Sequence, residues 1–332
     1  MDFGFGISDL GLGGVCIGLI AVCAAPAAAT VPTYAQTGAF TLPSAGSVFD
    51  VGTDGRAVVV DESGNILRGD APSGSSYATI GHMPAGLVPG FGAGFARLSP
   101  DGAHLAVGDN GTVSQMWIAT MGSLNPGGST PVQTINVPNF DAAWTASSKL
   151  YVNGSPSFGS PPSLYRVDTT TSAAAAVVSN IGDGSGGVAA HAGRVFTAIG
   201  YDASPGGASS GLSRSFDLST LDSAAASVPF STGAFAAQAN SGSSLAFDSG
   251  GNLIVAGFGG VAVFDLTTSQ RYDLPGLSSS GFYAATWDAF AGEILVRDFG
   301  STTVLEYGIV PAPGAVSLLA AGLIATRRRR HG

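Results

Sequence analysis

The chain repeats itself about every 48 residues between Ser47 and Ile309, and this period constrains its fold more than any other feature. Each unit contains a short apolar segment, such as L-Y-R-V-D-T from Leu164 and V-A-V-F-D-L from Val261, that is predicted to be a strand closing the unit. Equivalent positions follow one another at steps of 49, 49, 49, 48 and 43 residues; they are Asp70, Ala119, Asp168, Asp217, Asp265 and Gly308. A period of this length is typical of repeat architectures.

Upstream in each unit lies a second recurring pattern, which consists of an apolar segment, a turn and another apolar segment. The clearest copy is F-A-R-L-S-P-D-G-A-H-L-A-V-G from Phe95. Pro100 sets φ for the first turn position, Asp101 can bond its own backbone, and Gly102 accepts the conformation that closes a hairpin. The unit is therefore predicted to be a set of antiparallel strands.

Composition agrees with many short strands joined by turns, since the chain has 50 Gly, 18 Pro and only 11% charged residues. One such unit cannot bury both its faces, whereas several placed around an axis can. The sequence predicts an all-β fold, a β-propeller of six blades over residues 30–309, with almost no helix outside the two ends of the chain. Seven blades are the alternative, because the fourth unit is long at Ser204 to Ser213. Ala35 to Leu42 is predicted to supply the outer strand that completes the last blade and closes the ring.

The S-P-D-G hairpin resembles the WD40-like repeat of TolB-type and other bacterial propellers. The resemblance is clearest in the second unit, and it implies the same radial fold.

Residues 1–29 are predicted to be a signal peptide. Gly11 to Ala29 is apolar and ends in three alanines, of which Ala27 and Ala29 suit the −3 and −1 positions that signal peptidase accepts. Both cysteines, Cys16 and Cys23, lie in this segment, so the mature chain is expected to have neither a disulfide nor a thiolate metal site.

Residues 310–332 combine a proline motif, a short apolar stretch and four consecutive cations. The motif is Val310, Pro311, Ala312, Pro313 and Gly314, and the cations are Arg327, Arg328, Arg329 and Arg330. An apolar segment followed by arginines is typical of a transmembrane helix with a cytoplasmic anchor.

This tail resembles the C-terminal sorting signal of bacterial PEP-CTERM proteins, except that Ala312 stands where that family usually has Glu. The resemblance implies an exosortase-like membrane protease as a partner. It also implies export, membrane anchoring by the tail before processing, and a final place at the cell surface or outside the cell.

Candidate chemistry is sparse. Asp141, Asn153, Asp248 and Asp288 lie near predicted strand ends, where propeller hydrolases of the lactonase kind hold a metal, but Asp at such places usually caps a turn. His82 and His104 have no partner at metal-ligand spacing. His191 stands where other units have Asp or Thr and is expected to be a hydrogen-bonded blade residue. The sequence therefore predicts no catalytic residue, metal site or cofactor.

Three short motifs are explained by the repeat or by loops. Arg68-Gly69-Asp70 occupies the closing strand of a unit, Gly90 to Gly94 lacks the following helix of a phosphate loop, and Asp183 to Gly187 has one carboxylate, too few for calcium.

The formal net charge of −9 and the single lysine argue against nucleic acid as a partner. Two functions remain. The first is an exported, non-enzymatic propeller that binds an unknown surface or matrix ligand, and the alternative is an exported lactonase-like hydrolase.

Overall fold

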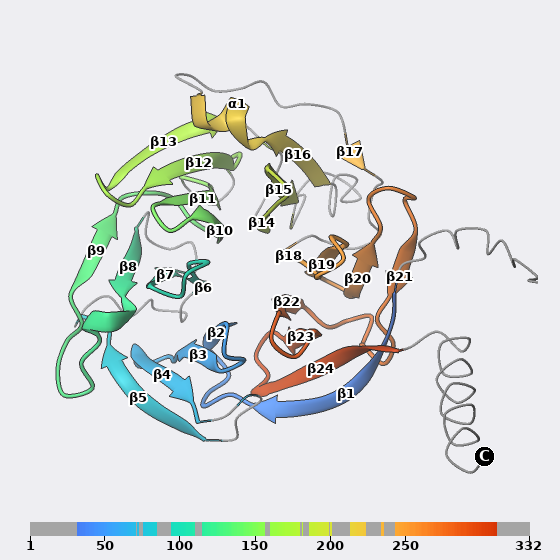
Figure 1. Cartoon of the computed structure of the whole chain (residues 1–332), viewed down its shortest axis with the longest axis horizontal. Helices are drawn as coiled ribbons and strands as arrows, with labels where there is room; N and C mark the ends of the chain where they lie inside the picture. Colours follow the sequence, from blue (N-terminus) through green and yellow to red (C-terminus); the bar gives the residue numbers. More distant parts are fainter. Residues whose placement is uncertain are drawn as a thin grey trace, which may run out of the picture. The chain divides into compact units, whose positions relative to one another are not determined.

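The computed structural model describes residues 32–70, 72, 76–84, 94–109, 115–156, 160–179, 181, 186–198, 200, 213–223, 234–235 and 243–310. In these residues the chain forms six four-stranded antiparallel sheets, which confirms the six-bladed β-propeller and excludes the seven-bladed alternative (Figure 1).

The first five blades take their strands in chain order. The first three blades are β2 (Val48–Val51), β3 (Ala57–Val60), β4 (Asn65–Gly69) and β5 (Tyr77–His82); β6 (Phe95–Leu98), β7 (His104–Gly108), β8 (Met116–Thr120) and β9 (Val132–Ile135); and β10 (Asp141–Ala146), β11 (Lys149–Gly154), β12 (Ser163–Asp168) and β13 (Ala173–Val178).

The next two blades are β14 (Val188–His191), β15 (Arg194–Ala198), β16 (Ser213–Asp217) and β17 (Ala234–Phe235); and β18 (Ser244–Phe247), β19 (Leu253–Gly257), β20 (Gly260–Phe264) and β21 (Arg271–Asp273). The sixth is β22 (Tyr283–Asp288), β23 (Glu293–Asp298), β24 (Thr303–Val310) and, from the start of the chain, β1 (Thr33–Thr41). The helices in the described residues are η1 (Met121–Ser123) and α1 (Leu218–Ser223).

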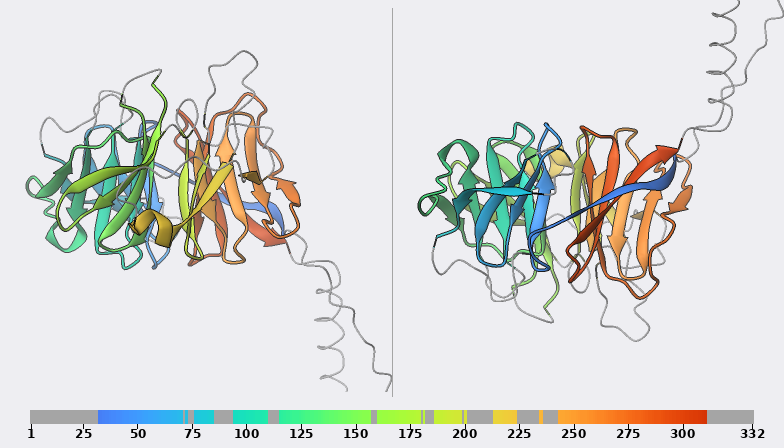
Figure 2. Two further views of the ribbon diagram at one scale, coloured as in Figure 1. Left: turned by 90° about the horizontal axis from the view of Figure 1, so that it is seen from above. Right: turned by 90° about the horizontal axis from the view of Figure 1, so that it is seen from below.

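The ring closes through β1. This strand runs antiparallel to β24, from Thr33 opposite Val310 to Thr41 opposite Thr303, with one irregularity between Gln36 and Gly38. Figure 2 shows the blue β1 alongside the red β24. The prediction that Ala35 to Leu42 completes the last blade is confirmed, although Leu42 lies just beyond the strand.

Each of the six repeat positions lies in or directly after the third strand of its blade, as the period predicts. The predicted strand–turn–strand units are the first two strands of each blade. One part of the prediction is wrong. The third strand does not close the unit, because a fourth strand follows it in each blade.

Gly102 has a φ of 67°, and its N–H donates to the Ser99 carbonyl at 2.8 Å, as expected for the S-P-D-G hairpin. The Asp101 carboxylate accepts the Ala103 N–H at 3.0 Å. The blade therefore has the four-stranded antiparallel form of a WD40-like repeat.

The hydrophobic core is divided among the seams between blades. In the described residues, six clusters of buried side chains each draw from two neighbouring blades, and together they fill all six seams. The first strands also contact one another in order around the axis, from β2 to β6, β10, β14, β18, β22 and back to β2. Each blade thus buries both faces only because it has two neighbours.

Candidate functional site

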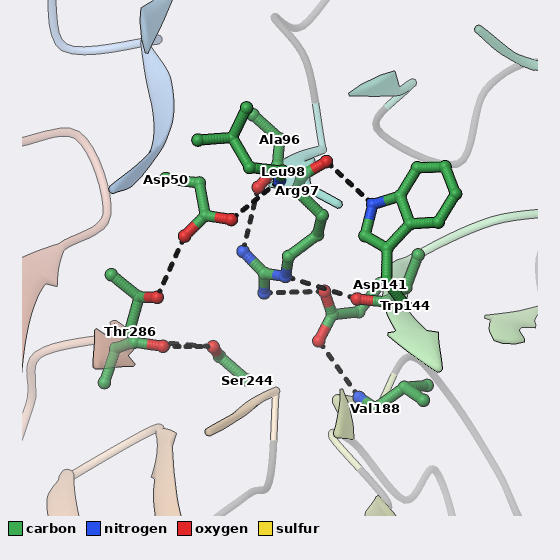
Figure 3. Close-up of polar contacts among 11 residues, drawn as sticks. Asp50, Ala96, Arg97, Leu98, Asp141, Trp144, Val188, Ser244 and Thr286 are labelled. Carbon is green, nitrogen blue, oxygen red and sulfur yellow. Dashed lines mark hydrogen bonds and ion pairs between the residues drawn. The ribbon is translucent and has the colours of Figure 1, made fainter. Parts of the chain in front are cut away.

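The first strands carry polar side chains that cross the seams around the axis (Figure 3). Asp50 on β2 accepts the N–H of Leu98 on β6 at 2.8 Å and the hydroxyl of Thr286 on β22 at 3.2 Å. Asp50 therefore ties the first blade to the second and the sixth.

Arg97 on β6 continues this set of contacts. Its Nη2 donates to Asp141 Oδ1 on β10 at 2.7 Å, and its Nε donates to the Ala142 carbonyl at 3.2 Å. The other oxygen of Asp141 accepts the N–H of Val188 on β14 at 3.0 Å. Between the fifth and sixth blades, Ser244 Oγ donates to the Ala285 carbonyl at 2.9 Å. We call Asp50, Arg97, Asp141, Ser244 and Thr286 the channel belt.

The seam between the fourth and fifth blades is crossed by close backbone packing instead. A Cβ added to Gly187 would lie 2.7 Å from the Leu245 backbone nitrogen, so a larger residue cannot fit there without movement.

Burial raises the pKa of Asp50 and Asp141, while the positive charge of Arg97 acts in the opposite direction on both. Arg97 is the cation that compensates these buried carboxylates, and all of the groups are held by hydrogen bonds. The arrangement stabilises the ring, and it leaves neither Asp141 oxygen without a hydrogen-bond donor.

The four candidate metal ligands are not brought together. Asp141 and Asn153 lie opposite each other on β10 and β11. Asp248 accepts the N–H groups of Gly250 and Asn252 at 2.9 and 2.8 Å, and Asp288 likewise caps a turn. Within the described residues no three His, Cys, Asp or Glu side chains are grouped as metal ligands.

The histidines have structural neighbours. His82 Nδ1 and Nε2 lie 2.8 and 3.0 Å from Asn65 Oδ1 and the Pro126 carbonyl. His104 stacks on Trp144 and His191 on Phe247, with ring centroids 6.2 and 4.6 Å apart.

Arg68 belongs to β4, the third strand of its blade, as the repeat predicts. It forms an ion pair with Asp54, so the Arg-Gly-Asp tripeptide is part of the blade structure. Residues 90–93 and 183–185 of the glycine-rich motifs lie outside the described residues.

One end of the channel forms a mouth that the sequence did not reveal. The first strands begin there, and the mouth contains two adjoining hollows of about 90 and 210 Å³. Both are lined by Val48, Phe140, Ser244 and Arg297, and the larger one also by Phe282 and Phe299.

Arg297, which lies on β23, is 7% exposed, and burial lowers the pKa of its guanidinium. The sequence signal that marks it is a cation directly after the apolar run I-L-V, in the segment E-I-L-V-R-D.

The predicted cleavage residues Ala27 and Ala29 and the tail from Pro311, including Arg327 to Arg330, lie outside the described residues. Val310, the first residue of the predicted sorting motif, ends β24 and is 41% exposed. No helix within the described part of the chain is long and apolar enough to cross a membrane.

Together, the closed ring of six blades and the axial channel define the chain as a β-propeller. No protein-family model matches it, and no curated protein sequence gives a significant match. Its fold is similar to that of solved structures at 11–13% identity, which is evidence of fold alone.

One similar structure is in a mitotic checkpoint complex (TM-score 0.54, 11% identity, covering 91% of this chain and 100% of that one). A second is in a nidogen/laminin complex (TM-score 0.51, 13% identity, covering 72% of this chain and 82% of that one). A third is a structural genomics protein of unknown function from Bacteroides thetaiotaomicron (TM-score 0.53, 11% identity, covering 84% of this chain and 77% of that one).

Proposed function

We propose that this protein is an exported, non-enzymatic propeller that binds a surface or matrix ligand at its channel mouth. The observation that carries the proposal is a difference between the charged groups around the axis, some of which are hydrogen-bonded within the ring while one is not. The belt carboxylates are occupied in holding blades together, whereas a buried cation, Arg297, lines the open mouth beside the aromatic rings of Phe282 and Phe299. Such a surface suits recognition, because it offers aromatic contact area beside a few polar groups, of which Arg297 carries a charge without an ion-pair partner among the described residues.

Export and sorting complete the proposal. Signal peptidase would cut near Ala29, and an exosortase-like protease would process the tail after Arg327 to Arg330 had stopped its transfer. Support comes from the order of apolar leader, repeats, proline motif, apolar stretch and arginines along the chain. The acidic, lysine-poor composition also fits a partner other than nucleic acid.

The alternative is a lactonase-like hydrolase, and one observation favours it. Asn153 is 1% exposed and lies opposite Asp141, and neither its amide oxygen nor its amide nitrogen has a hydrogen-bond partner among the described residues. An amide oxygen next to a carboxylate is a pair of the type that a divalent cation accepts.

Two assays on the full-length protein separate these functions. The binding role predicts that the protein cosediments with envelope or matrix fractions, and that Phe282→Ser with Phe299→Ser abolishes cosedimentation. A matched control is Phe290→Ser, since Phe290 is also exposed, at 61%, but does not line the mouth.

The catalytic role predicts turnover of lactones that depends on a divalent cation and is lost in Asn153→Ala. Observing that turnover, with no cosedimentation, would overturn the proposed function.

A further inference from the structure

Arg297 lies in the seam between the sixth and first blades. Side chains alternate along β23, so Arg297 shares its side of the strand with Leu295. Leu295 belongs to the cluster that packs the sixth blade against Ala57 and Val59 of the first. Arg297 therefore occupies the end of an apolar seam, where the seam opens into the mouth that Val48 also lines.

No group in the described residues neutralises this cation. Arg297 makes no ion pair with a described carboxylate, and its buried Nη1 has no hydrogen-bond partner among the described residues. Glu306 on β24 lies opposite Leu295, one diagonal step away from Arg297, and does not bond to it. The Asp298 carboxylate accepts the Phe282 N–H at 2.9 Å. A buried charge without a partner is costly unless something else compensates it.

The hollows beside the guanidinium are partly open to solvent and combine aromatic side chains with polar ones. Ser244 lines both hollows, and the smaller one is also lined by Arg97 and Asp141, which pair with each other. Phe282 and Phe299 are 41% and 67% exposed and meet edge to face with centroids 6.5 Å apart, and Phe140 lines the same hollow. The hollows, at about 90 and 210 Å³, are each smaller than the roughly 300–1,000 Å³ of pockets for drug-sized ligands. A fitting ligand is therefore small, carries one negative charge and has an apolar body.

We propose that the channel mouth binds a small organic monocarboxylate, whose carboxylate pairs with Arg297 and whose apolar body packs against Phe140, Phe282 and Phe299. A planar guanidinium matches a carboxylate through paired hydrogen bonds. A strongly hydrated dianion such as phosphate is disfavoured by the aromatic rim. It is also disfavoured because Arg97, the other cation that lines the hollows, is already paired with Asp141, which leaves one described cation without an ion-pair partner. This inference rests on the proposed binding role and names the chemical class of its ligand.

The test is isothermal titration of the full-length protein with benzoate. Benzamide has nearly the same shape without the charge, acetate has the charge without the ring, and inorganic phosphate has more charge and no apolar part. We expect benzoate to bind, and benzamide to bind roughly 10- to 100-fold more weakly, the range for hydrogen bonds to a charged group. Acetate and phosphate should also bind more weakly than benzoate.

Arg297→Met is expected to lose the preference for benzoate over benzamide. Arg194→Met is the matched control and should keep this preference. Arg194 begins the second strand of its blade, β15, whereas Arg297 lies near the end of the second strand of its own blade, β23. The two arginines therefore lie near opposite ends of the channel. Equal binding of benzoate and benzamide by the parent, or unchanged selectivity in Arg297→Met, would overturn the proposal.

Thermal unfolding without ligand distinguishes a ligand-binding cation from a structural one. Removing an uncompensated buried charge should leave the melting temperature of Arg297→Met equal to or above that of the parent. A marked fall would show that Arg297 has a structural partner, and the proposal would fail.

The two proposals also fail differently. No benzoate binding with normal envelope cosedimentation refutes the carboxylate ligand alone, whereas benzoate binding without cosedimentation refutes the surface role.

Discussion

Replacing Tyr34 tests how the first strand holds the ring closed. Tyr34 is 1% exposed and projects from β1 into the seam between the fifth and sixth blades. Its hydroxyl donates to Asp248 Oδ2 at 2.7 Å, and its backbone carbonyl accepts the Tyr272 hydroxyl at 2.8 Å. Burial, and then the hydrogen bond to Asp248, raise the pKa of Tyr34, so the hydroxyl stays a neutral donor.

Tyr34→Phe removes one hydrogen bond to a charged acceptor, a change worth about 1.5–3 kcal/mol. Asp248 keeps three other donors, two N–H groups and the Asn252 amide, so the expected loss lies near the lower end, about 1.5 kcal/mol. Tyr34→Ala also removes the ring from a fully packed seam, which costs about 3–5 kcal/mol.

Urea unfolding of the full-length protein measures both losses. The slope of the unfolding free energy against urea concentration should be the same in all variants, so that a shift of the midpoint reports stability alone. Tyr77→Phe is the matched control, because the Tyr77 hydroxyl is buried without a hydrogen-bond partner among the described residues, and its removal should cost nothing. If Tyr34→Phe costs no more than Tyr77→Phe, the closing strand is not anchored through Asp248 and the reasoning is refuted.

Three further predictions concern the belt, a turn and the tail. Arg97→Met should destabilise the protein by about 3–5 kcal/mol, because it leaves the buried Asp141 without its cation, and a urea midpoint equal to that of the parent would contradict this. Hydrogen bonds, chiefly from the Thr267 hydroxyl, lower the pKa of Asp265 to about 2, so its contribution to stability is present above its usual pKa and lost as the pH falls toward 2. Asp265→Asn should therefore flatten the dependence of stability on pH between about 4 and 2, as followed by acid titration of circular dichroism. Changing Arg327–Arg330 to serine should release the protein without ordered processing, as seen by cell fractionation, and unchanged retention would contradict the sorting role.

Most of the ring was predictable from the sequence because apolar residues recur at a nearly constant spacing in most of the first three strands of the blades. The fourth strands of the first five blades were missed for a physical reason, whereas that of the sixth was predicted as Ala35 to Leu42. They lie at the outer edge and need little apolar character. Ala173–Val178 has four exposed alanines, and Arg271–Asp273 has three residues without a buried one.

The candidate site was less predictable than the fold. Asp141 was identified as a potential metal ligand, but its role depends on Arg97, which is 44 positions earlier and adjacent only once the blades are placed around the axis. The turn roles of Asp248 and Asp288 followed from local sequence, because Asp bonds backbone groups within a few residues. Arg297 could be noticed as a cation in an apolar strand, but only the ring places it at the mouth.

Mass spectrometry of the protein recovered from the cell envelope tests most directly where this propeller acts. The mature chain is expected to start near Thr30 and to lack the peptide containing Arg327 to Arg330. Recovery of a chain with an intact Met1 and an intact arginine tail, confined to the cytoplasm, would contradict this expectation.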